Sequence, residues 1–148
     1  MKKLLLIAVF ALVFTVAACG NGDDAPDVEY PVEYFNATVT GSNVDGDTVV
    51  LTIDGEGFYP MTAEVTFEGG AMTDFVVIDH EESADWGGVI IERGDIQSSI
   101  VDQWDDLDNF DISPYKDVDA DTGATATAEA LEDIGVAAVE HYLEYYAD

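Results

Sequence analysis

Residues 61–79, MTAEVTFEGGAMTDFVVID, contain the pattern that decides the fold. The first eight residues alternate between apolar and polar side chains, which predicts a β-strand with one face on a core and the other in water. Gly69 and Gly70 turn the chain, and residues 72–79 then form the partner strand of an antiparallel hairpin. The unbroken apolar run at residues 75–78 predicts that this partner strand is central and covered on both faces.

Two further strands are predicted before this hairpin. Residues 33–40 (EYFNATVT) and 48–54 (TVVLTID) are rich in β-branched and aromatic residues, which favour strands. The segment between them, residues 41–47 (GSNVDGD), has the composition of a turn. The chain is therefore expected to form an antiparallel meander of about four strands.

Helical patterns dominate the rest of the chain. Residues 89–104 predict one or two short helices divided at Gly94, and residues 105–121 predict an acidic loop. A helical period then starts at Thr127, the predicted N-cap, and continues to about Tyr146. Its apolar stripe consists of Leu131, Ile134, Ala138, Tyr142 and Tyr145. These patterns together predict an α+β domain in which helices, including a long C-terminal one, cover an antiparallel sheet.

The N-terminal residues have the features of a lipoprotein signal. Residues 1–18 combine two lysines with an apolar run, and small residues lead up to Cys19 as in a bacterial lipobox. We therefore expect a signal peptide over residues 1–18, a lipidated linker over 19–32 and the folded domain over 33–148. Lipid on Cys19 would anchor the domain to the outer face of the cytoplasmic membrane. The alternative is an ordinary secretory signal with a chance cysteine.

The chain carries a large excess of negative charge, with a formal net charge of −28 at pH 7. After Lys2 and Lys3, only Arg93 and Lys116 are basic, against 32 carboxylate side chains. Such a surface disfavours nucleic acid and anionic lipid headgroups as partners. Because 48% of the residues are hydrophobic, the composition indicates a folded acidic domain, not a disordered chain. One hypothesis is adaptation to high salt, where ions screen the repulsion.

A short motif precedes the predicted C-terminal helix. Residues 119–125 read DADTGAT, with a glycine that permits a tight turn and an alanine that leaves room for a bound group. A phosphate placed at this point would meet the free N–H groups and the positive end of the helix dipole. The residues alone predict an anion site and nothing more specific.

The same motif, D-x-x-[ST]-G-A-T, resembles the flavinylation motif of the FMN-binding domain family. That family includes the flavin subunits of the Rnf and sodium-pumping quinone reductase complexes and small membrane-anchored flavin lipoproteins. The resemblance implies that a flavin transferase joins FMN through its phosphate to Thr125. The other motif residues would be Asp119, Thr122, Gly123 and Ala124.

The stretch from Gly57 to Gly88 is similar to the body of the same family. A short aromatic element, Phe58-Tyr59, precedes the hairpin, and Glu82-Ser83 stands where the family has Glu-Thr in a loop after the second strand. The family's proline in that loop is replaced by Ala84. The resemblance makes four residues candidate FMN-binding residues: Tyr59, Glu82, Ser83 and Thr127. Phe58, Trp86 and Trp104 could also stack on a flavin, although such aromatic residues are more often part of the core.

The expected function is an extracytoplasmic electron carrier with covalent FMN that exchanges electrons with membrane or surface redox partners. The alternative is a surface lipoprotein that binds a ligand or protein without flavin. A third reading, an enzyme that uses FMN on a small substrate, lacks an acid–base constellation. No catalytic residue is therefore predicted, and a redox carrier is favoured over a stand-alone enzyme.

Other chemistries have weaker sequence support. Asp117, Asp119 and Asp121 alternate as in a calcium loop, but Thr122 replaces the required glycine and no glutamate stands at the twelfth position. No metal site is therefore predicted. The two histidines show no zinc pattern, so His80 is expected at a strand end and His141 on a helix surface. Lys116 is expected to be an exposed loop lysine or, alternatively, to offset a phosphodiester charge.

Overall fold

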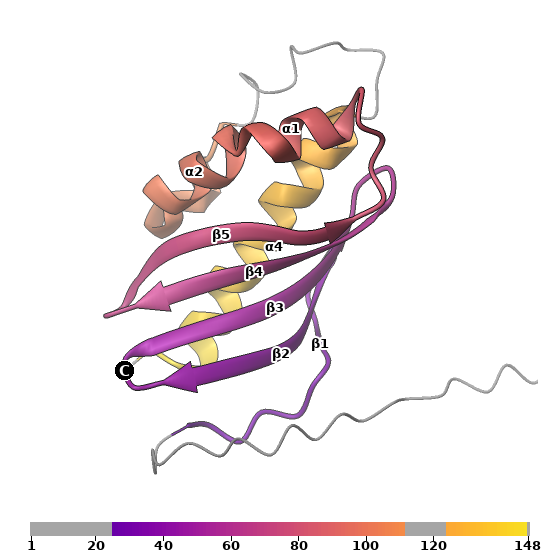
Figure 1. Ribbon diagram of the computed structural model, residues 1–148. Coiled ribbons are helices and arrows are strands. Elements are labelled where there is room, and N and C mark those ends of the chain that lie inside the picture. The colour runs from indigo at the N-terminus through magenta and orange to yellow at the C-terminus, as the bar shows by residue number, and fades with distance from the viewer. Residues whose placement is uncertain (1–24, 112–123, 148) are drawn as a thin grey trace, which may run out of the picture.

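Five antiparallel strands form one sheet in the order β1-β2-β3-β4-β5, so each strand pairs with its neighbour in sequence (Figure 1). The computed structural model describes residues 25–111 and 124–147. The strands are β1 (Val32–Glu33), β2 (Ala37–Asp45), β3 (Thr48–Glu56), β4 (Pro60–Glu68) and β5 (Ala71–His80). The predicted α+β class is confirmed, with five strands in place of about four.

The β4–β5 hairpin forms as its alternating pattern predicts. Along β4 the apolar residues Met61, Ala63, Val65 and Phe67 are buried, while Glu64 and Glu68 are exposed. The turn residues Gly69 and Gly70 both have positive φ, at 60° and 90°. L-residues with side chains rarely adopt such a conformation, so the two glycines allow the tight turn.

Strand β2 is longer than predicted. The segment 41–47 was expected to be a turn, but β2 continues to Asp45, and the turn to β3 is confined to the residues around Gly46. The register shifts between Val39 and Gly41, and beyond this point each residue pairs with one on β3, for example Asn43 with Val50. Pairing with a strong neighbouring strand therefore outweighs the turn-like composition of this segment.

The prediction that residues 72–79 form a central strand is wrong. β5 pairs only with β4 and is the last strand of the sheet. Phe75 is buried on the helix side, whereas Val76 and Ile78 are 45% and 51% exposed. The side chains of the unbroken apolar run thus point alternately to a buried face and to an exposed face of the sheet. The pairing register shifts between Thr62 and Ala63 on the partner strand.

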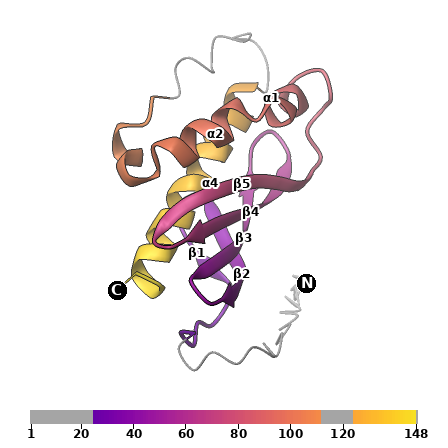
Figure 2. The same cartoon turned by 60° about the vertical axis from the view of Figure 1, so that its left-hand side comes forward.

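Helices cover one face of the sheet. The predicted pair is confirmed as α1 (Gly87–Arg93) and α2 (Asp95–Asp102), divided by Gly94 with φ of 68°. A short 3-10 helix, η1 (Trp104–Asn109), follows where a loop was predicted, because Leu107 and Phe110 pack into the core. Figure 2 shows α4 (Ala124–Tyr145) crossing the sheet, with α2 near β5.

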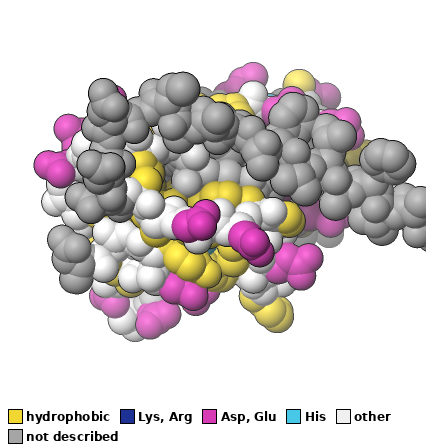
Figure 3. Space-filling view, turned by 90° about the horizontal axis from the view of Figure 1, so that it is seen from below, with side chains coloured by type: hydrophobic (Ala, Val, Ile, Leu, Met, Phe, Trp, Pro, Cys, Tyr) yellow, Lys and Arg dark blue, Asp and Glu magenta, His cyan; other side chains and the backbone are white. Residues whose placement is uncertain are grey.

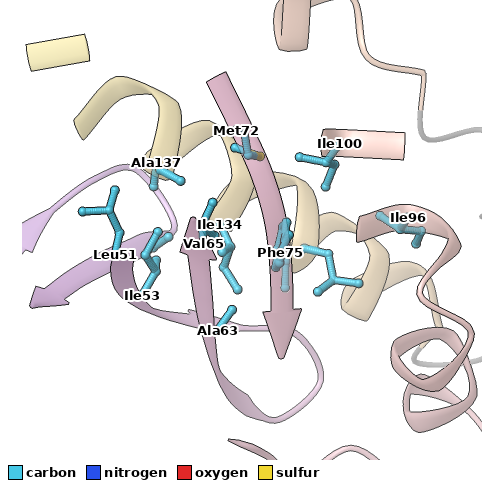
Figure 4. Packing of buried hydrophobic residues seen from close by; sticks show 14 of the residues in the cluster. Leu51, Ile53, Ala63, Val65, Met72, Phe75, Ile96, Ile100, Ile134 and Ala137 are labelled. Carbon is cyan, nitrogen blue, oxygen red and sulfur yellow. The ribbon is translucent and has the colours of Figure 1, made fainter. Parts of the chain in front are cut away.

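The core lies between α4, α2 and the sheet. Of the predicted stripe on α4, Leu131, Ile134, Ala138 and Tyr142 are buried, and Tyr145 is half-buried. Figure 4 shows the side chains of Ile134 and Ala137 directed toward apolar residues of the central strands, labelled Leu51, Ile53 and Val65. Full burial of each large aliphatic side chain contributes roughly 1.5–3 kcal/mol, so this interface is a main source of stability.

Candidate functional site

A buried carboxylate organises the region around the first turns of α4. Glu82, in the loop after β5, is only 8% exposed. Its Oε1 atom accepts hydrogen bonds from the backbone N–H groups of Phe58 and Tyr59, at 3.0 and 3.1 Å. The carboxylate therefore fastens the turn between β3 and β4 to the loop that leads into α1.

Two glycines let α4 approach this carboxylate closely. A Cβ atom on Gly57 would lie 2.7 Å from Glu82 Oε1 and 3.1 Å from the Cα atom of Thr127. A Cβ atom on Gly87 would clash with both Glu82 Oε2 and Thr127 Oγ1. Glu82 and Thr127 therefore lie side by side, and the backbone of three segments packs directly around them.

Thr127 is not the N-cap of the terminal helix, as the sequence had predicted. α4 begins at Ala124, so Thr127 lies within its first turn, and the side chain is completely buried. Thr127 packs against the backbone of Gly57 and Gly87 beside Glu82. Thr127 therefore helps to position the start of α4.

Thr125 is the second residue of α4 and is half-buried. In an α-helix the N–H groups of the first turn have no acceptor within the helix. Ala124 is the first residue of α4, whereas Asp119, Thr122 and Gly123 lie outside the described residues. Cys19, Lys116, Asp117 and Asp121 also lie outside them.

Exposed aromatic side chains flank the Glu82–Thr127 contact. Phe58 is 65% exposed and Trp86 is 47% exposed. Phe58 follows Gly57 and Trp86 precedes Gly87, the two glycines that lie against Thr127. The ring of Tyr59 packs edge-on against that of Phe58, with centroids 5.2 Å apart. Trp104 is different, because its ring packs edge-on against the buried Phe67.

Ser83 contributes its backbone to this region. Its carbonyl oxygen accepts hydrogen bonds from the N–H groups of Trp86 and Gly88, at 3.2 and 2.9 Å. Ser83 itself is exposed. These bonds form the turn that begins α1 and set the position of Trp86. Of the four candidate flavin-binding residues, the structure thus places Tyr59 and Ser83 at the surface and buries Glu82 and Thr127.

An open acidic groove of about 670 Å³ lies along α4 from Ala126 to Asp133. It runs between the first half of α4, which contributes Ala126, Glu129 and Asp133, and the segment from Glu33 to Thr38. Burial raises the pKa of Asp133, a hydrogen bond from Asn36 opposes this effect, and the charge of Glu129 adds to it. Such a groove favours cationic over anionic ligands.

The two histidines have different environments. His80 ends β5 as predicted, and its Nδ1 atom is buried without a hydrogen-bond partner among the described residues. The prediction for His141 is wrong, because it is fully buried and hydrogen bonded to Tyr30 and Tyr34. Its partners come from more than 100 positions earlier in the chain, so the local sequence carries no signal of them.

Residues 25–111 and 124–147 contain no group of three or more His, Cys, Asp or Glu side chains that could hold a metal ion. Within the same ranges, every helix is too short or too polar to span a bilayer. No protein-family model, no curated protein and no solved structure matches the chain.

Proposed function

We propose that this chain is a lipid-anchored electron carrier with FMN joined through its phosphate to the hydroxyl of Thr125. The observation that carries the proposal is the motif of residues 119–125 together with the position of Thr125 in the first turn of α4. A flavin transferase makes the bond, and lipid on Cys19 holds the carrier at the outer face of the cytoplasmic membrane. Its partners are membrane or surface redox proteins.

The residues around Thr125 fit a phosphate ester. The positive end of the helix dipole favours an anion at the first turn of α4. Thr125 is only half-buried, so its side chain is within reach of a transferase. Thr127 is fully buried beside Glu82, which makes Thr125 the better acceptor of the two.

The surrounding aromatic side chains fit a flavin ring. Phe58, Tyr59 and Trp86 are exposed next to the Glu82–Thr127 contact, two residues along α4 from Thr125. Aromatic faces stack favourably on planar ring systems and exclude water from them. Glu82 holds the backbone of Phe58 and Tyr59 in place, and Ser83 holds that of Trp86. When bound, FMN accepts two electrons and releases them singly.

A covalent bond is suited to this acidic surface. Glu129 is exposed one turn along α4 from Thr125, and the groove beside it carries further carboxylates. Such a field repels the phosphate of a freely diffusing FMN. A phosphoester bond retains the cofactor despite this repulsion, and the acidic field would then lower the potential of the bound flavin by disfavouring its anionic reduced form.

The test is in-gel flavin fluorescence after denaturation. The full-length chain is expressed for export together with a flavin transferase, beside the variants Thr125→Ala and Thr73→Ala. Thr73 is an exposed threonine on β5, far from the motif in sequence, and serves as the matched control. We expect fluorescence to migrate with the wild-type and Thr73→Ala bands and to be lost from Thr125→Ala. A dark wild-type band, with transferase activity shown on another substrate, would contradict the proposal.

The acidic groove favours a second candidate function, a surface lipoprotein that binds a ligand without flavin. Glu33, Glu56, Glu129 and Asp133 line it, which suits a cationic ligand. The hydroxyl of Thr125 discriminates between the two functions. A flavin carrier loses its cofactor in Thr125→Ala, whereas a binding module keeps its ligand.

A further inference from the structure

The N-terminal edge of the sheet is held by side chains more than by strand pairing. β1 contains two residues, Val32 and Glu33, which pair with Val39 and Thr38 of β2. A two-residue strand supplies few ladder hydrogen bonds, so it is weakly held by the sheet alone. Tyr30 and Tyr34 flank β1 and both pack against the core.

Both tyrosines bind the same buried histidine of α4. The hydroxyl of Tyr34 lies 2.9 Å from Nδ1 of His141, and the hydroxyl of Tyr30 lies 3.2 Å from Nε2. The tyrosine rings also contact the imidazole, with centroids 5.9 and 5.7 Å away. His141 is fully buried. One side chain of α4 therefore fastens both ends of β1.

The neutral imidazole of His141 has one N–H donor and one acceptor nitrogen, so the two tyrosine hydroxyls can satisfy both of its nitrogens. The hydroxyl of Tyr30 also lies 3.1 Å from that of Tyr146, which donates to Ser42 at 2.8 Å. The hydroxyl of Tyr34 is also hydrogen bonded to Glu144.

A second proton on His141 would disturb this arrangement. It would attach to the nitrogen that now accepts a tyrosine hydrogen, so that hydroxyl would have to turn its hydrogen away. It would also place a positive charge in a fully buried position, which costs free energy unless a partner compensates. We propose that the Tyr30–His141–Tyr34 cluster is an acid-sensitive latch, in which protonation of His141 releases residues 30–34 from α4.

The groups that face His141 support this direction. Burial is the largest influence and lowers the pKa of His141, while the carboxylate of Glu144 partly opposes it. Burial raises the pKa of Tyr34 to about 12 and that of Tyr30 further, so both hydroxyls stay neutral from pH 5 to 8. The other groups near the cluster are Glu140, Tyr145 and Tyr146 on α4 and Ser42 on β2.

The sign of the effect follows from proton linkage. A lowered pKa in the latched state means that the released state binds the proton more tightly. The latch is therefore most stable above pH 6.5, the ordinary pKa of histidine, and weakens as the pH falls below it. Between pH 7.5 and pH 5 the released fraction should rise by up to about 30-fold. The released segment joins the domain to the preceding part of the chain.

Two measurements on the full-length chain test the latch. Proton NMR follows the imidazole C2–H signal of His141, which His80→Gln identifies because the chain has only two histidines. We expect His141 to titrate below pH 6.5. As the pH is lowered from 7.5 to 5, hydrogen-exchange protection factors should fall for residues 32–39 and stay constant for the β3–β4 hairpin. The variant His141→Gln, which cannot titrate, should lose this pH dependence.

Three results would overturn the latch. The first is titration of His141 at or above pH 6.5 in the wild-type chain, a measurement that needs no folded variant. The second is equal loss of protection with acid in His141→Gln. The third is simultaneous opening of residues 32–39 and the β3–β4 hairpin, which would mean global unfolding. None of these depends on flavin, so the latch and the proposed function can fail separately.

Discussion

At the scale of residues, Glu82 is the side chain on which the site depends most. Its Oε1 atom accepts hydrogen bonds from the backbone N–H groups of Phe58 and Tyr59. Because Glu82 is buried, little water is available to replace these hydrogen bonds. Loss of an acceptor from buried donors costs about 1–3 kcal/mol for each donor left unpaired.

We therefore expect Glu82→Ala to lower the free energy of unfolding by about 2–3 kcal/mol, measured by urea denaturation. Glu82→Gln keeps one acceptor oxygen and should lose less. Glu81→Ala is the matched control, because Glu81 is exposed in the same loop. If Glu82→Ala proved as stable as Glu81→Ala, the carboxylate would not be an anchor.

Residue-scale prediction from the sequence succeeded where the environment is local. The alternation of residues 61–68 identified the buried side of β4 correctly. It failed for Thr127 and His141, two polar residues that were expected at a helix end and a helix surface and are fully buried. Their partners lie far away in the sequence, so only the folded chain reveals them. The role of Thr125 stays a prediction.

At the scale of elements, the contact between α4 and β3 depends on a glycine. A Cβ atom on Gly55 would lie 2.7 Å from Cδ1 of Ile134, which is fully buried. Overpacking of this kind typically costs 1–3 kcal/mol, partly offset here by the roughly 0.5–1 kcal/mol that alanine gains over glycine in a strand. Gly55→Ala should therefore destabilise the protein by about 1 kcal/mol or more.

A double-mutant cycle isolates this contact. A Cβ atom on Gly55 would also lie 2.8 Å from Cγ1 of Ile134. Ile134→Ala removes both Cδ1 and Cγ1, so Gly55→Ala should cost clearly less in that background, as measured by urea denaturation. Gly41→Ala on β2 is the matched control, because a Cβ atom there meets nothing within 4 Å. Equal costs of Gly55→Ala with and without Ile134→Ala would show that the helix does not approach as closely as described.

Element types were easier to predict than element positions. Composition and periodicity identified the hairpin, the two short helices and the long helix. The sheet position of β5 was missed, since an apolar run does not reveal whether a further strand pairs beyond it. The two residues of β1 are too few to give a periodic signal. The segment is attached to α4 through the hydrogen bonds of Tyr30 and Tyr34 to His141.

At the scale of the whole molecule, negative charge is the dominant feature. The formal net charge is −28, and Figure 3 shows Asp and Glu side chains spread over one side of the described surface. Mutual repulsion destabilises the compact state, and salt screens it as the Debye length falls from about 10 Å at 0.1 M to about 3 Å at 1 M.

We therefore expect the free energy of unfolding to rise between dilute buffer and molar KCl, measured by thermal denaturation at pH 7.5. Chloride is the appropriate salt, because sulfate would also strengthen the hydrophobic effect. The chosen pH keeps His141 neutral, so the latch does not contribute to the change. Equal stability in dilute buffer and in molar KCl would remove the hypothesis of adaptation to high salt.

The most direct test of the proposed function locates the flavin on the chain by mass spectrometry. Trypsin cleaves after Lys116, and no Lys or Arg follows in the sequence, so the motif leaves in a peptide that begins at Asp117. After co-expression of the full-length chain with a flavin transferase, we predict that this peptide gains the mass of one FMN less one water, with fragmentation placing the group on Thr125. An unmodified peptide beside a flavinylated control substrate, or a flavinyl group on Thr122 or Thr127, would contradict the account.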